Sequence, residues 1–141
     1  MMKFILLTIA LLLLSPVAWA YRPLEGIILP LGDNPPVVVE QISSSLQDTK
    51  LGRSLIWDTT LILKNTSAKP IRAFEVEVIM TDIQGKVITR LVRPFVVPIE
   101  PQAQTTQQLS QLHLAWPGSA TAVRVKTVTF ADETRWELPV P

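Results

Sequence analysis

The clearest pattern in the chain is a strict alternation of apolar and polar side chains within residues 71–81. Apolar residues occupy alternate positions from Phe74 to Met80, and Glu75 and Glu77 lie between them. Successive side chains of a β-strand point to opposite faces, so this alternation predicts a half-buried strand. Residues 82–85 have the composition of a tight turn, and 86–92 is expected to return as the next strand.

Short β-branched segments recur along the rest of the chain, separated by residues that favour turns. Strands are expected at 37–42, 56–64, 71–81, 86–92, 104–109, 122–131 and 134–138. The polar segment 43–54 is expected to be a loop, and 65–70 a turn. A helix is an alternative for 104–114, but its leucines follow a helical period only in part.

This pattern predicts an all-β domain without a sustained, capped helix. About seven short strands at close spacing are typical of an immunoglobulin-like antiparallel β-sandwich, and an up-and-down barrel is the alternative. In such a sandwich the third and sixth strands are neighbours. Glu75 and Glu77 of the third strand are then expected to face Arg124 and Lys126 of the sixth across one solvated outer face.

The segment 21–36 precedes these strands and differs from them in composition. It contains four prolines together with Leu24, Ile27, Ile28 and Leu29. Proline lacks a backbone donor, so the segment is expected to be extended and to lie outside the centre of a sheet. Its apolar residues indicate that it packs on the domain or is reserved for a partner.

The first twenty residues predict export. Lys3 gives the chain a positively charged start, and residues 4–14 are apolar apart from Thr8. Ala18 and Ala20 are the two small residues of a cleavage site after residue 20. These are the three parts of a secretory signal peptide, and the apolar run is too short to span a bilayer. We therefore expect a signal peptide at 1–20 cleaved after Ala20, an N-terminal segment at 21–36 and one domain at 37–141.

The amino-acid composition limits the cellular compartment and the classes of partner expected for the exported chain. The chain has no cysteine, which excludes disulfides and thiol chemistry and favours a bacterial periplasmic or secreted protein. The formal net charge of +1 is accounted for by Lys3, so the remaining chain is about neutral. Nucleic-acid binding requires a basic excess that is absent here. No second long apolar run follows, so no transmembrane span is expected after cleavage.

Candidate catalytic groups are few in the sequence. His113 is the only histidine and lies between two leucines, and Asp132 and Glu133 are adjacent in an expected turn. A metal site or a glycosidase pair needs ligands or carboxylates that converge from separate positions. The glycines are scattered and form no phosphate-binding loop. We therefore expect no enzyme activity, no cofactor and no metal.

The tryptophans and the basic residues after residue 85 are the other candidates for binding. Trp57 and Trp136 are expected in the core, whereas Trp116 lies in an expected loop, where it either stacks on a partner or folds back as a plug. Arg90 and Arg93 belong to a basic stretch that forms either a binding patch or a charged guard on an edge strand.

Three segments together resemble a known family. They are a strand that runs into Asn65 and Pro70, a strand that ends at residues 82–88, and residues 128–136. The chain is similar in these turn and core residues to FxLYD-type and related immunoglobulin-like domains of bacterial secreted proteins. The resemblance implies the fold and export. It implies an accessory or interaction role and carries over no catalytic residue.

The first functional hypothesis is an exported, non-catalytic domain that binds another envelope or secreted protein. Segments 21–36 and 94–101 would offer unpaired strand surface for β-augmentation. The candidate partner surface comprises Leu24, Ile27, Ile28, Leu29, Trp116, Arg90 and Arg93. The alternative is a carbohydrate-binding module for an envelope or extracellular glycan. A small envelope enzyme is a weaker reading, since it requires a pocket that joins His113 to a carboxylate.

Overall fold

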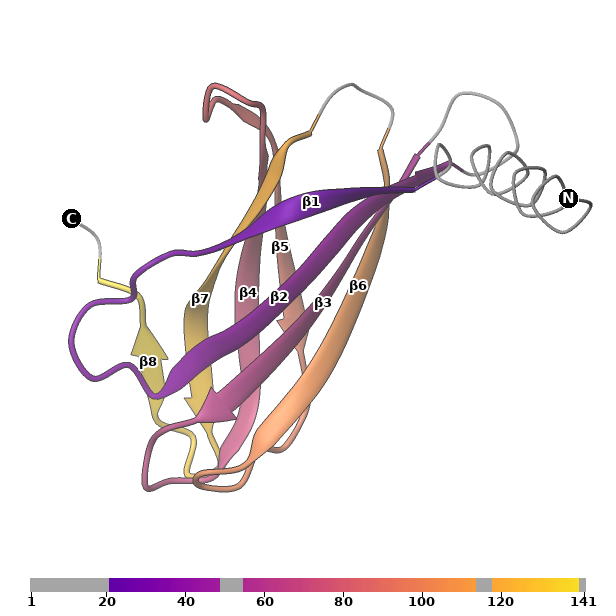
Figure 1. Ribbon diagram of the computed structural model, residues 1–141. Coiled ribbons are helices and arrows are strands. Elements are labelled where there is room, and N and C mark those ends of the chain that lie inside the picture. Colours follow the sequence, from indigo (N-terminus) through magenta and orange to yellow (C-terminus); the bar gives the residue numbers. More distant parts are fainter. Residues whose placement is uncertain (1–20, 49–54, 114–117, 140–141) are drawn as a thin grey trace, which may run out of the picture.

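A computed structural model of the chain describes residues 21–48, 55–113 and 118–139, and within them every regular element is a β-strand (Figure 1). The expected all-β class is confirmed. The strands are β1 (Tyr21–Ile28), β2 (Val37–Asp48), β3 (Leu55–Asn65), β4 (Ile71–Thr81), β5 (Val87–Phe95), β6 (Gln104–His113), β7 (Ala120–Phe130) and β8 (Arg135–Glu137). The expected signal peptide at 1–20 lies outside the described residues.

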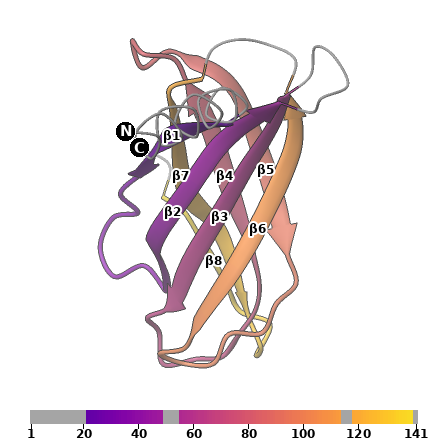
Figure 2. The ribbon, with the colours of Figure 1, turned by 45° about the vertical axis from the view of Figure 1, so that its right-hand side comes forward.

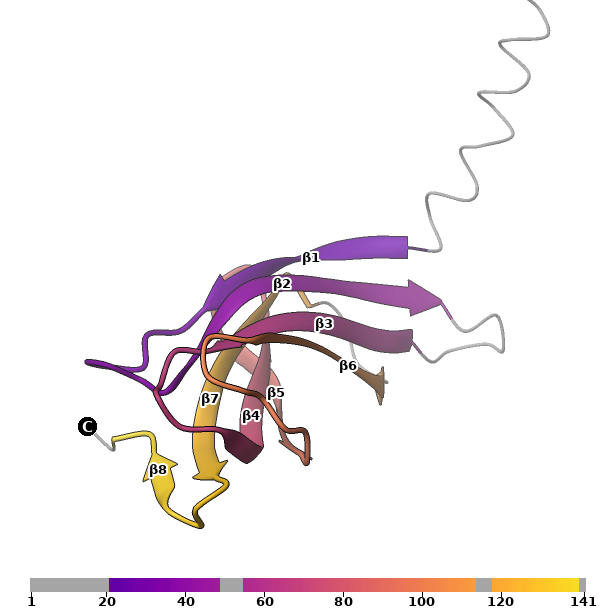
Figure 3. The same ribbon diagram turned by 90° about the horizontal axis from the view of Figure 1, so that it is seen from below.

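The strands form one curled mixed sheet. Their order is β5-β4-β7-β1-β2-β3-β6, and β8 pairs with β7 off this path. Neighbouring strands are antiparallel except β1 and β7, which run parallel. The sheet curls so that β4, β5 and β7 face β2, β3 and β6 across a common interior (Figure 3). The edge strands β5 and β6 therefore lie on the same side of the molecule (Figure 2).

The prediction that segment 21–36 lies outside the sheet centre was wrong for its first half. Residues 21–24 pair with β2 and residues 25–28 pair with β7, so β1 joins the two halves of the sheet. Pro23 is the only proline in this strand. Gly26 permits the close approach of β1 to β2, since a Cβ atom there would lie 2.9 Å from Ile42 Cβ. The other prolines follow the strand and shape the loop.

The core fills the space between the two halves of the sheet. The inner face predicted for β4 is confirmed, because Phe74, Val76, Val78 and Met80 are all buried. The strand is not half-buried throughout, however, since Glu77 and Ile79 on the other face are buried as well. The Phe74 ring stacks on Phe95 of β5 with centroids 5.3 Å apart. From β3, the expected apolar face Trp57, Leu61 and Leu63 is buried as well. Burial of such large side chains is the main stabilising contribution in a chain without disulfides.

The expected loop 43–54 is wrong in its first half, because β2 continues to Asp48. The polar residues there are satisfied inside the core. Ser44 Oγ lies 2.9 Å from Thr59 Oγ1 and 2.7 Å from Thr121 Oγ1, and Trp57 Nε1 donates to Thr121 Oγ1 at 3.1 Å. Buried hydroxyls that pair with one another cost little, so serines can continue the strand. Residues 49–54 lie outside the described part.

Two further expectations are confirmed. Residues 104–113 form a strand and not a helix, with four more residues than the expected 104–109. The third and sixth expected strands, which are β4 and β7, are neighbours, and Glu77 lies directly opposite Arg124.

Candidate functional site

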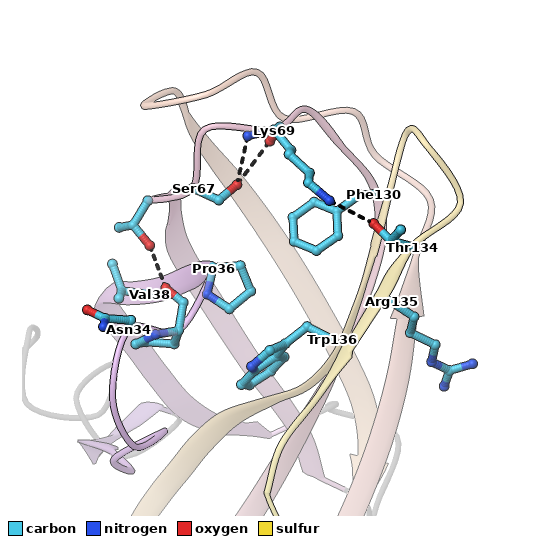
Figure 4. Close-up of a pocket in the computed structure, with 11 residues that line it drawn as sticks. Asn34, Pro36, Val38, Ser67, Lys69, Phe130, Thr134, Arg135 and Trp136 are labelled. Atoms are coloured by element: carbon cyan, nitrogen blue, oxygen red, sulfur yellow. Dashed lines mark hydrogen bonds between the residues drawn. The ribbon is translucent and has the colours of Figure 1, made fainter.

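A hollow lies at the end of the sheet where the β7–β8 hairpin meets the loop before β2 and the turn after β3 (Figure 4). Its volume is about 750 Å³, which falls in the range of small-molecule and peptide pockets. It is lined by Asn34, Pro35, Pro36, Val38, Thr66, Ser67, Lys69, Phe130, Thr134, Arg135 and Trp136.

The floor of this hollow is apolar. Figure 4 shows the Trp136 indole and the Pro36 ring on opposite sides of the hollow, with the Phe130 ring at its far end. Pro36 and Phe130 are buried, and Trp136 is partly exposed. An indole that is only partly covered offers a flat apolar surface to a ligand.

Asn65 builds the rim next to this floor. It is fully buried, and its Nδ2 donates to the carbonyls of Lys69 at 2.8 Å and Ile99 at 2.9 Å. Its Oδ1 accepts from the backbone N–H and the hydroxyl of Ser67. The side chain thus closes the turn onto itself and onto the segment before β6. The prediction of a turn at 65–70 is confirmed, and an amide held in this way is closed to glycosylation in the folded chain.

Lys69 is held at the rim by three groups. Its Nζ lies 3.1 Å from Asp132 Oδ2, donates to Thr134 Oγ1 at 3.1 Å, and lies 5.1 Å from the centroid of the Phe130 ring. Hydrogen bonds from the hydroxyl and backbone N–H of Thr134, helped by Lys69, lower the pKa of Asp132 from 3.8 to about 2. The carboxylate is therefore ionised at any physiological pH and keeps the ammonium group over the ring.

Arg135 contributes its backbone to the hollow but sends its guanidinium group away from it (Figure 4). The guanidinium pairs with Glu75 at 3.6 Å and with Glu137 at 3.3 Å on the outer face of the sheet. Lys69 is therefore the cation that a ligand in the hollow would meet.

The outer face of β4 and β7 carries the expected ion pairs, with one correction. Glu77 contacts Arg124 at 3.0 Å, Lys126 at 3.5 Å and also Arg90 of β5 at 3.2 Å. Glu77 is buried and not solvated as expected, because the three long cationic side chains cover it. Glu75 instead accepts from the Thr127 hydroxyl at 2.8 Å.

The candidate partner surface proposed from the sequence is not a single surface. Leu24 is a core residue, so its assignment to a surface was wrong. Ile27 and Ile28 are exposed and Leu29 is partly buried. Residues 21–24 of β1 already pair with β2 and residues 25–28 with β7, so β1 is not the unpaired strand that was expected to be available for β-augmentation.

The segment before β6 is also less free than expected, since Ile99 and Ile71 exchange backbone hydrogen bonds at 2.9 and 3.0 Å. Arg90 and Arg93 lie on opposite faces of β5. Arg90 reaches Glu77 on the outer face, whereas Arg93 donates to Gln111 Oε1 of β6 at 2.7 Å. The two arginines therefore do not form one basic patch.

The structure assigns no chemistry to the remaining candidates. Trp116 and the side chain of His113 lie outside the described part of the chain. Within residues 21–48, 55–113 and 118–139, no group of three or more His, Asp or Glu side chains is placed to hold a metal ion. No helix among these residues is long and apolar enough to cross a membrane.

Trp136 was expected in the core, and this is confirmed only in part. It packs against the core with part of its surface and also lines the hollow. Its position in the sequence could have indicated this partial exposure. Trp136 lies between Arg135 and Glu137 in a three-residue strand near the end of the chain, and so short a strand covers only one side of an indole.

No protein-family model and no curated protein matches this chain. Among solved structures, the chain is similar to a structural-genomics target described as "X-ray structure of Northeast Structural Genomics Consortium target SoR45". The TM-score is 0.51 at 10% sequence identity, and the match covers 75% of this chain and 83% of the other. At this identity the likeness concerns the fold alone.

Proposed function

We propose that this chain is an exported, non-catalytic binding domain of the immunoglobulin-like sandwich type. It binds an extended, proline-containing segment of another envelope or secreted protein in the hollow between Trp136 and Pro36. The observation that carries this proposal is the apolar, aromatic floor of that hollow beside a rim of hydrogen-bonding groups.

The shape and chemistry of the hollow support a peptide ligand. Proline-rich segments dock in grooves lined by aromatic rings, because a preformed polyproline II helix loses little entropy on binding. Trp136 and Phe130 supply the rings, the Lys69 ammonium group supplies a donor at the rim, and the Ser67 hydroxyl oxygen supplies an acceptor. Lys69 further favours a segment with an acidic side chain or carboxyl terminus, since its charge faces the same hollow.

The other parts of the proposal rest on different observations. Export rests on the charged start, the apolar run and the cleavage site within residues 1–20. The sandwich arrangement is supported by the two facing halves of the curled sheet, which enclose a single core. The non-catalytic part of the proposal rests on the sequence, in which His113 is the only histidine and Asp132 and Glu133 are adjacent.

A glycan is the second candidate ligand, and Trp136 is again the reason. A partly exposed indole can stack on a sugar ring, and the Asn34 amide and Ser67 hydroxyl lie at the same hollow to bind hydroxyl groups. The peptide and the glycan would thus bind at the same hollow.

Binding to arrayed proline-containing peptides and to arrayed envelope glycans tests both candidates with the purified protein. Under the proposal, peptides bind, and both Trp136→Ala and the milder Trp136→Leu weaken binding by about tenfold or more. Ile83→Ala, at an exposed site in the β4–β5 turn, is the matched control and leaves binding unchanged.

Circular dichroism and thermal melting establish that each variant is folded. If the protein binds arrayed glycans and does not bind arrayed peptides, the ligand is a glycan and the peptide proposal is wrong. Peptide binding that is unaffected in folded Trp136 variants would refute the site.

A further inference from the structure

The curled sheet has two free edges that differ sharply in chemistry. β5 and β6 are its terminal strands, so each has one side that no described strand pairs. β6 pairs with β3 from His113 to Gln104 without a register shift, which leaves a straight, regular edge of ten residues. The pairing of β5 with β4 is interrupted by a shift near Thr81.

β5 carries the features by which proteins protect an edge strand. It contains Arg90, Arg93 and Pro94, and charged residues, proline and bulges all discourage pairing with another chain. β6 has none of these features. Its sequence is QTTQQLSQLH, with no lysine, arginine, acidic residue or proline. A long regular edge without protection is suited to pair with another strand.

We propose that β6 pairs with β6 of a second copy of this chain, antiparallel and around a two-fold axis. The pairing would join the two curled sheets edge to edge. With Gln108 on the axis, Thr106 of one copy faces Ser110 of the other, and Gln104 faces Leu112. An interface of this kind buries the free edge of both copies at once and closes the assembly at two.

The charges around β6 favour a second copy as the occupant. Every pair of residues that faces across the axis is uncharged, because residues 104–112 contain no ionisable side chain. Two described acidic groups contact β6 side chains: Glu40 of β2 accepts from Gln104 at 2.5 Å, and Asp58 of β3 accepts from Gln108 and from Ser110, each at 3.0 Å. Asp58 lies on the strand next to β6, so it is the acidic group closest to the proposed axis. The two copies of Asp58 would be three strand spacings apart, about 14 Å. That separation exceeds the screening length of about 8 Å at physiological salt.

The exposed side chains of β6 agree with a continued sheet. Thr106, Gln108, Ser110 and Leu112 are exposed on one face, and Leu112 is 64% exposed although it is a large apolar residue. In the dimer Leu112 gains the aliphatic part of Gln104 from the other copy as a neighbour. From β5, Arg93 contacts β6 at the side chain of Gln111 and not at its backbone, which leaves the hydrogen-bonding edge open.

The test is the mass of the purified protein in solution, measured by sedimentation velocity over a wide concentration range. We expect a monomer–dimer equilibrium for the natural sequence. The double variant Thr106→Lys/Ser110→Lys places two lysine pairs face to face in the dimer and is expected to raise its dissociation constant by about 100-fold. Val92→Lys, a charge at an exposed position of the other edge strand, is the control and leaves the dimer intact.

Circular dichroism distinguishes loss of pairing from loss of folding, and Thr106→Lys alone serves if the double variant fails to fold. A protein that stays monomeric at about 200 µM, far above the dissociation constants of specific interfaces, would overturn the proposal. A folded lysine variant that dimerises like the natural sequence would overturn it too. Binding of β6 by a different protein without any dimer would have the same consequence.

Discussion

Asn65→Asp is the sharpest test of the turn that supports the hollow. The substitution keeps the shape of the side chain and its ability to accept hydrogen bonds from Ser67. It removes both donors that reach the carbonyls of Lys69 and Ile99. Both carbonyls therefore lose the amide donor and face a carboxylate instead, while the Ile99 carbonyl keeps the N–H of Ile71 and the Lys69 carbonyl keeps the hydroxyl of Ser67 as partners.

The expected loss follows from these contacts. An intramolecular hydrogen bond contributes about 0.5–1.5 kcal/mol, so the loss of two such bonds costs about 1–3 kcal/mol. Domains of this size unfold with about 5–15 kcal/mol, so the loss is a measurable share of the total. The carboxylate adds repulsion at neutral pH. Protonation restores one donor, and the deficit is therefore expected to shrink as the pH falls.

Urea unfolding followed by tryptophan fluorescence measures this loss. Asn65→Asp should lower the midpoint strongly while the slope stays the same, as expected for a change in stability alone. Asn34→Asp makes the same chemical change at an exposed position and should shift stability by less than about 0.5 kcal/mol. If Asn65→Asp unfolds within about 1 kcal/mol of the natural protein, the amide does not donate to the two buried carbonyls, and the reasoning is refuted.

Two further predictions concern the Asp132 carboxyl and the approach of β1 to β2. The pKa of Asp132 is lower in the folded chain than its ordinary 3.8, so its contribution to stability is present above that pH and is lost as the pH falls towards about 2. The stability difference between the natural protein and Asp132→Asn should therefore disappear as the pH falls from 3.8 towards about 2. In an NMR titration of the carboxyl carbon, the midpoint for Asp132 should lie near 2. A midpoint near 3.8 would contradict the contacts with Thr134. Gly26→Ala places a Cβ atom 2.9 Å from Ile42 Cβ, and overpacking of this kind costs about 1–3 kcal/mol. Thermal melting measures that loss, and Ile83→Ala at an exposed position of the β4–β5 turn is the control. An unchanged melting temperature for Gly26→Ala would show that the two strands can separate at no cost.

The sequence predicted most of the strands because their signal is local. The strand at 71–81, the turn at 65–70 and the return strand after residue 85 all depend on neighbouring residues, and these three elements are confirmed. The same local reasoning failed at 43–48. A run of serines has the composition of a loop, and its hydroxyls become acceptable in a strand only when Thr59 and Thr121 arrive from β3 and β7.

The binding hollow could be predicted only in part, for a related reason. The prolines at 35 and 36 and the Asn65 turn were visible as loop features, but nothing local places them beside Phe130 and Trp136. The burial of Trp136 depends on how much of its ring neighbouring segments cover. Arg90 and Arg93 likewise form a basic stretch in the sequence, while the pleat of β5 sends them to opposite faces.

The sequence by itself determined that this chain forms β-strands, where most of them turn, and which residues of each strand are apolar. These properties follow from backbone preferences and from the two-residue period of a strand, which act within a few residues. Only the tertiary structure decided that β1 lies between β2 and β7, that β6 is an edge, and that Glu77 is buried under three cations. Which strands become neighbours depends on packing between residues that are far apart in the chain. The binding hollow and the free edge of β6 both depend on this strand order, so neighbouring residues alone do not predict them.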